Sequence, residues 1–130
     1  MQEKKKVSSS SAVNAVGTYS LGEEIANAVT HGLAVLLSIA GLVLMIIFAV
    51  RQSAGALAIV STSIFGASMI ILYTVSTLYH AIPNLRAKRV LQVLDHSAIY
   101  ILIAGSYTPF CLITLGGTTG IVLCSVVWTI

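Results

Sequence analysis

Long, uninterrupted apolar runs are the feature of this sequence that most limits its fold. Residues 32–50 and 54–79 carry no charged side chain, and a third uncharged apolar run covers residues 97–115. A helix needs about 20 apolar residues to cross the ~30 Å hydrocarbon layer of a bilayer. The sequence therefore predicts an all-α protein with three helices that cross a membrane.

A fourth apolar run begins near residue 119 and reaches the last residue, 130, so it holds only 12 residues. At 1.5 Å per residue it spans about 18 Å, which is too short to cross. We therefore expect about three and a half spans, in a sequence that stops within its fourth helix.

The charge content excludes several classes of protein. Charged residues make up 8% of the chain and hydrophobic residues 57%, whereas soluble domains usually carry about 25% charged residues. So few charges cannot cover the surface of a water-soluble fold. A soluble enzyme and a nucleic-acid-binding module are therefore excluded, and a multi-pass protein of the cell membrane is predicted.

Lysine and arginine residues are grouped in the segments outside these runs. Residues 1–18 hold three lysines followed by serines, and residues 86–89 hold three more basic residues, whereas Arg51 stands alone between the first two spans. Basic residues concentrate on the cytoplasmic side of membrane proteins. We therefore expect residues 1–18 to be a disordered cytoplasmic tail and residues 19–130 to be the membrane domain.

Polar residues gather at the predicted cytoplasmic end of the spans. Glu24, Asn27 and His31 have the i, i+3, i+7 spacing of one helix stripe, and Ser76 and His80 are one turn apart. Such groups are costly beside lipid, so they should point into the bundle or a water-filled cavity.

Asp95 opens the third predicted span at the same membrane face. We expect Ser76, His80 and Asp95 to share one pocket at the inner leaflet. Zinc prefers histidine nitrogen, and a catalytic zinc site keeps one position for water, with a carboxylate near enough to take its proton. This group of side chains is therefore suited to a zinc site.

Simpler interpretations remain open for each residue taken singly. Asp95 is also suited to cap the third helix at its N-terminus, and His80 is suited to the C-terminal end of the second. Three tyrosines fit an aromatic belt at the membrane surface: Tyr19, Tyr79 and Tyr100. Three glycines in or beside the spans are expected to allow close helix contact: Gly55, Gly66 and Gly105.

The polar residues also form motifs in a fixed order: Glu24-x2-Asn27-x3-His31, Ser76-x3-His80, and Leu94-Asp95-His96-Ser97 followed by Ile103-Ala104-Gly105-Ser106-Tyr107-Thr108-Pro109. Together they resemble the hemolysin III proteins, which are bacterial relatives of the progestin and adipoQ receptors. The resemblance runs from about Tyr19 to the end of the chain. It implies a seven-helix bundle with a cytoplasmic N-terminus, related to zinc proteins that include the alkaline ceramidases.

The resemblance also implies roles for individual residues. His80 would be a zinc ligand, Asp95 would hold or deprotonate the zinc-bound water, and Ser76 would orient that water or a substrate oxygen. A supporting role is implied for three residues: Glu24, Asn27 and His31. The other two ligands in such proteins come from a His-x3-His motif, which these 130 residues do not contain. We therefore expect weak or no zinc binding, and no turnover, from this chain alone.

Three functions remain open at this stage. The first is a zinc-dependent hydrolase that cleaves a lipid amide or ester, and the second is a channel-forming cytolysin. The third is a receptor or lipid-homeostasis protein that binds a lipid without turning it over. Membrane lipids are the expected partners in each case, a homo-oligomer is an open alternative, and nucleic acid is not expected.

Overall fold

The computed structural model describes residues 19–129, and this part of the chain contains helices and no strand. The predicted tail, residues 1–18, lies outside the described residues. In chain order the helices are α2 (Leu21–Arg51), α3 (Gly55–Ala81), α4 (Leu85–Pro109), the π-helix η1 (Phe110–Leu115) and α5 (Gly117–Thr129). The all-α prediction is confirmed.

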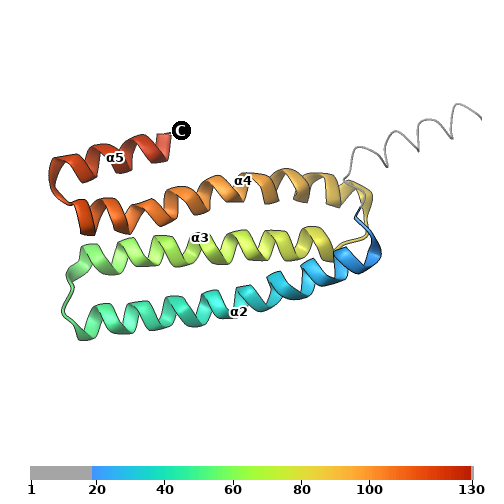
Figure 1. Cartoon of the computed structure of the whole chain (residues 1–130), viewed down its shortest axis with the longest axis horizontal. Coiled ribbons are helices and arrows are strands. Elements are labelled where there is room, and N and C mark those ends of the chain that lie inside the picture. Colours follow the sequence, from blue (N-terminus) through green and yellow to red (C-terminus); the bar gives the residue numbers. More distant parts are fainter. Residues whose placement is uncertain (1–18, 130) are drawn as a thin grey trace, which may run out of the picture.

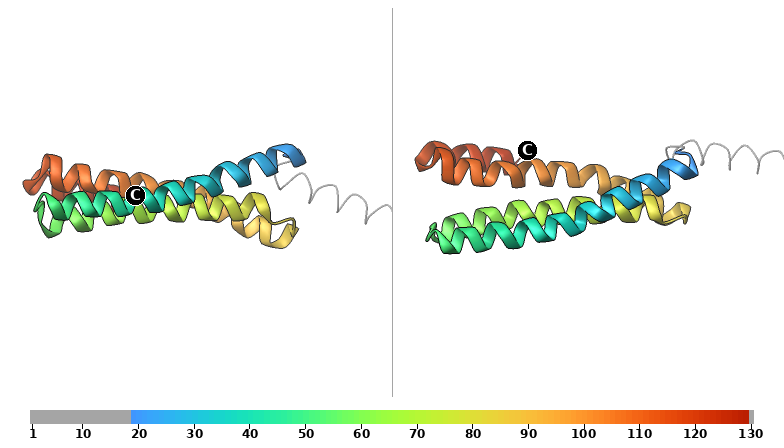
Figure 2. Two further views of the ribbon diagram at one scale, coloured as in Figure 1. Left: turned by 90° about the horizontal axis from the view of Figure 1, so that it is seen from below. Right: turned by 60° about the horizontal axis from the view of Figure 1, so that its bottom comes forward.

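The three long helices lie side by side, with α3 between α2 and α4 (Figure 1). Successive helices run in opposite directions, and α5 turns back along the far end of α4 (Figure 2). The beginning of α2, the end of α3 and the beginning of α4 therefore meet at one end of the bundle (Figure 1).

The surface and the interior are those of a protein surrounded by lipid. By length and composition α2, α3 and the continuous segment Leu85–Leu115 can each cross a membrane, whereas α5 is shorter. Large aliphatic residues point outward, and Leu37 is 73% exposed. Most of the buried positions of α3 and α4 carry small side chains, among them Ala58, Ser61, Gly66, Ser68, Ala98, Ala104 and Gly105. Small residues let membrane helices pack closely.

Two helices begin well before the apolar runs that predict them. The first, α2, begins at Leu21 because Ser20 caps it: the Ser20 side chain accepts from Glu23 N (3.3 Å), and Ser20 N donates to Glu23 Oε2 (2.7 Å). This reciprocal pair is a capping box. Hydropathy detects only the part of a helix that is suited to hydrocarbon, so it misses the polar first turns.

The start of α4 corrects an interpretation of Asp95. Asn84 is the N-cap, and its Oδ1 accepts from Arg86 N (3.0 Å) and Ala87 N (3.2 Å). The helix therefore begins at Leu85, and Asp95 lies inside it rather than at its start. The interpretation of Asp95 as an N-terminal cap is wrong.

Glycines have two different uses in this fold. A Cβ atom on Gly105 would lie 2.8 Å from Ser68 Cβ, and a Cβ on Gly66 would lie 2.9 Å from Leu42 Cβ, so both residues permit close helix contact as predicted. Gly55 has φ +84° and nothing within 4 Å of its Cβ position. The packing role predicted for Gly55 is therefore wrong, because this residue supplies backbone conformation at a turn.

Replacing Gly105 with alanine should destabilise the chain, because the added methyl group meets Ser68 on the neighbouring helix. Overpacking of this kind costs about 1–3 kcal/mol of unfolding free energy. The measurement is thermal or denaturant unfolding in detergent. Gly41→Ala is the matched control, since no atom lies within 4 Å of its added Cβ. Equal destabilisation by the two variants would contradict the packing argument.

Candidate functional site

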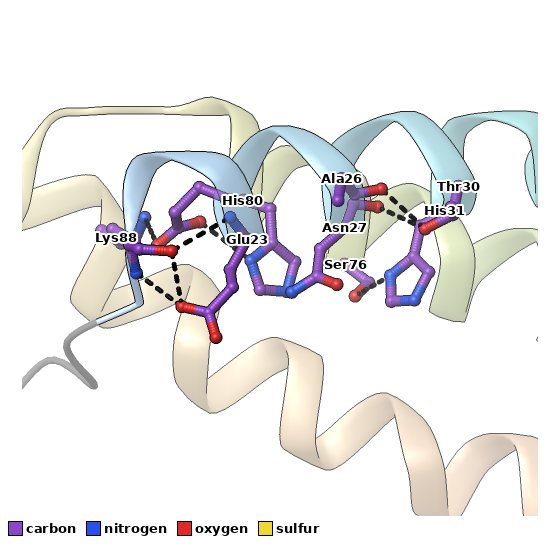
Figure 3. Close-up of polar contacts among 10 residues, drawn as sticks. Glu23, Ala26, Asn27, Thr30, His31, Ser76, His80 and Lys88 are labelled. Atoms are coloured by element: carbon purple, nitrogen blue, oxygen red, sulfur yellow. Dashed lines mark hydrogen bonds and ion pairs between the residues drawn. The ribbon is translucent and has the colours of Figure 1, made fainter.

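Two side-chain pairs join α2 to α3 at the end where three helices meet. The His80 Nδ1 atom lies 2.9 Å from Glu24 Oε2. The His31 Nδ1 atom lies 2.6 Å from Ser76 Oγ, and these two side chains face each other in Figure 3. The ring centroids of His31 and His80 are 5.9 Å apart. The structure thus brings together four of the residues that the sequence singled out.

Lys88 adds a third helix to this group. Its Nζ atom donates to Glu24 Oε1 at 2.5 Å, so the Glu24 carboxylate bonds α3 through one oxygen and α4 through the other. All three side chains are largely buried: 6% of His80, 14% of Glu24 and 11% of Lys88 is exposed. We call Glu24, His80 and Lys88 the carboxylate cluster.

The cluster determines how the His80 ring is used. A lysine ammonium group only donates hydrogen bonds, and an ionised carboxylate only accepts them. Because Lys88 donates to Glu24, the carboxylate is best stabilised in its ionised form, and the proton of the second bond then belongs to His80 Nδ1. In a neutral imidazole the remaining nitrogen, Nε2, carries the free lone pair.

Two tyrosine rings lie beside this cluster. Tyr79 is 2% exposed, with its ring centroid 4.7 Å from that of His80 and 5.3 Å from Lys88 Nζ. The ring of Tyr19 lies edge-on to His80 at 5.5 Å. The prediction that Tyr79 belongs to an interfacial belt is wrong, because its ring packs among charged groups inside the bundle.

Asp95 and Asn27 lie near the predicted place without joining these pairs. Asn27 is half-buried on α2 between Glu24 and His31. Asp95 is half-buried on α4, and among the described residues it forms no hydrogen bond or ion pair with His80 or Ser76. The convergence of Ser76, His80 and Asp95 in one pocket stays a prediction.

An open groove of about 370 Å³ lies beside the carboxylate cluster. One wall carries the three polar side chains of the cluster, and the rest is aliphatic, including Ile25, Val29 and Ile82. A groove with these two kinds of wall matches a molecule with a polar group and a hydrocarbon part.

The described residues do not complete a metal site. Between residues 19 and 129, no three His, Cys, Asp or Glu side chains are grouped so that they could hold a metal ion. His80 can offer one nitrogen, and structural and catalytic zinc sites need at least three protein ligands. Any zinc site that uses His80 therefore requires ligands from outside this part of the chain.

The sequence reasoning missed Lys88, which it treated as one of several topology charges. Arg86 and Arg89 are exposed, as expected for such charges, but Lys88 is buried. Its spacing to Asp95 is i, i+7, which places both residues on one face of a helix. Because Asp95 is a predicted site residue, this spacing indicates that Lys88 lies on the same face of α4 as the site.

Removing the Lys88 charge should destabilise the bundle, because it leaves the buried Glu24 carboxylate without its cation. Breaking a buried pair from one side costs about 3–5 kcal/mol, and the residual exposure of both groups favours the lower end. In thermal or denaturant unfolding in detergent, Lys88→Met should therefore have a clearly lower midpoint than Arg89→Met, whose parent side chain is exposed.

The double variant Glu24→Gln, Lys88→Met tests whether the two effects are one interaction. Residues in one ion-pair network show coupling energies of about 0.5–3 kcal/mol. The free energy of unfolding lost in the double variant should therefore be smaller than the sum of the losses in Glu24→Gln and Lys88→Met. Simple addition of the two losses would contradict the pairing.

Comparison with known proteins gives a family. The family model described as "Haemolysin-III related" matches residues 19–130. The hemolysin-3 homolog of Bacillus subtilis (strain 168) is 54% identical over 112 residues, covering 86% of this chain and 52% of the relative. Hemolysin-3 of Bacillus cereus is 48% identical over 108 residues, covering 83% of this chain and 49% of the relative.

No solved structure matches the chain significantly. The chain spans about half the length of the curated relatives it matches. With three helices able to cross a membrane and a family match over nearly all of the described residues, this chain belongs to the haemolysin-III-related family of membrane proteins.

Proposed function

We propose that the full-length protein is a zinc-dependent membrane hydrolase that cleaves an amide or ester bond of a lipid, with His80 as one zinc ligand. The observation that carries this proposal is the bond between His80 Nδ1 and Glu24. Histidines that ligate zinc usually donate their other ring N–H to a carboxylate or carbonyl, which fixes the ring and its tautomer. His80 has that arrangement, with Nε2 left for a metal.

The surrounding residues supply the remaining functions. Zinc bound at His80 would polarise a substrate carbonyl and activate water. Asp95 would accept a proton from the attacking water, and Ser76 would hydrogen-bond an oxygen of the reacting group. The aliphatic wall of the groove beside Glu24 would hold part of the lipid's hydrocarbon chain.

Zinc affinity of the full-length protein tests the role of the cluster. His80→Ala should lose zinc, because it removes a ligand. Glu24→Gln should weaken zinc binding by about 10- to 100-fold, the usual cost of losing an outer carboxylate partner. The measurement is zinc titration of purified protein in detergent. Glu23→Gln is the control, since Glu23 caps α2 and, within residues 19–129, its carboxylate bonds Ser20 alone.

Turnover separates the metal from the chemistry. Asp95→Ala should retain most of the zinc yet lose hydrolysis of a p-nitrophenyl ester of a fatty acid. Equal zinc content in the wild type and His80→Ala would remove His80 from the site. Stoichiometric zinc without hydrolysis by the wild type would favour a receptor that binds a lipid and leaves it unchanged.

We also propose that the N-terminus and the carboxylate cluster lie on the cytoplasmic side of the cell membrane. Six lysines and arginines belong to the N-terminal tail and the α3–α4 end, against Arg51 alone at the opposite end. Such a difference sets orientation in membrane proteins.

A pair of single cysteines tests this orientation in a background with Cys111 and Cys124 changed to alanine. A membrane-impermeant maleimide should label Arg51→Cys on intact cells and Arg89→Cys only after the membrane is permeabilised. Both parent residues are exposed, so access does not limit either reaction. The reverse pattern would invert the proposed topology.

A further inference from the structure

Ser76 differs from the other buried hydroxyl residues in this chain. The described residues contain five buried serines and threonines: Ser38, Ser61, Ser68, Ser76 and Thr108. Four donate to a carbonyl oxygen three or four residues earlier in their own helix, at 2.7–2.8 Å. This is the default for serine and threonine in apolar helices, because it satisfies the hydroxyl proton locally.

Ser76 makes its hydrogen bond across the helix interface instead. Its Oγ atom lies 2.6 Å from His31 Nδ1 on α2, and the side chain is 3% exposed. Among the described residues, no carbonyl of α3 accepts a hydrogen bond from this hydroxyl. His31 therefore supplies from another helix the hydrogen-bond partner that the other four residues find in their own helix backbone.

The position of His31 is itself fixed by its neighbours. Its ring contacts those of Tyr73 and His80 edge-on, with centroids 5.9 Å apart in each case. A ring held in this way can direct its Nδ1 atom at a fixed point. Ser76 is one turn from His80 on the same face of α3, so that point lies beside the proposed metal ligand.

We propose that His31 is a positioning residue. Through Nδ1 it holds the Ser76 hydroxyl off the backbone of α3 and on the face that carries His80, where this hydroxyl bonds an oxygen of the reacting group. In this arrangement His31 Nδ1 donates to Ser76 Oγ, so the single hydroxyl proton of Ser76 stays free to be donated to that oxygen. This inference rests on the proposed function, and it assigns His31 a task that acts through Ser76.

Two substitutions of His31 separate this role from simple packing. His31→Phe keeps a ring against Tyr73 and His80 but removes Nδ1. In His31→Asn the side-chain amide nitrogen lies close to the position of Nδ1, while most of the ring is lost. If His31 only fills space, phenylalanine should be the milder change. If it positions Ser76, asparagine should be the milder change.

The activity test uses the zinc-loaded full-length protein and the p-nitrophenyl fatty-acid ester. His31→Phe should lower kcat to the level of Ser76→Ala with little change in KM, and the double variant should be no slower than either single one. His31→Asn should recover at least a third of the lost kcat. The control Ser61→Ala, which removes a buried serine bonded to its own backbone, should keep wild-type kcat.

A second measurement does not depend on zinc or turnover. The ¹⁵N resonance of His31 Nδ1 in the metal-free full-length protein should shift in Ser76→Ala and stay unchanged in Ser61→Ala. An unchanged resonance in Ser76→Ala would overturn the inference. So would a double variant, His31→Phe with Ser76→Ala, whose fold-loss of kcat equals the product of the two single fold-losses. If the wild type binds zinc but hydrolyses nothing, the proposed function fails, and with it the part of Ser76 in turnover. The resonance shift would then establish only the pairing of His31 with Ser76.

Discussion

The buried Glu24 carboxylate is the constraint on which this end of the bundle depends. Burying a carboxylate without hydrogen-bond donors is strongly destabilising. Glu24 on α2 therefore requires donors from other helices. His80 supplies one from α3 and Lys88 supplies one from α4. The bond to Glu24 engages Nδ1 of His80, so Nε2 is the ring nitrogen that lies outside this contact. The same contacts thus join three helices and fix the orientation of the His80 ring.

The requirement for internal partners explains the rest of the interior as well. Deep in the spans, serine and threonine hydroxyl groups donate to carbonyl oxygens of their own helices. Contacts between helices rely on small residues such as Gly105 and Ser68. Thr108 follows this rule even where it meets another helix: it donates to Ala104 O and only accepts from Trp128 Nε1 at 2.9 Å. Ser76 departs from the rule within a turn of the carboxylate cluster, where function is proposed.

The sequence predicts the helices far better than it predicts their ends. Uncharged runs identify the spans because the bilayer requires such runs, but the first turns of α2 and α4 depend on the caps Ser20 and Asn84. Helical spacing places Glu24 and His31 on one stripe of α2, and the structure turns both toward α3. Spacing within one helix cannot say which helix supplies the partner. For that reason the contact of Lys88 with Glu24 was not foreseen.

The two carboxylates of this region have different surroundings, and the difference bears on their roles. Glu24 is bonded through both oxygens, to a histidine on α3 and a lysine on α4. Asp95 lies two turns beyond Lys88 on the same face of α4, and the described residues give it no cation. Glu24 therefore orients the His80 ring, and this difference is why the proposed hydrolase gives the role of proton acceptor to Asp95 rather than to Glu24.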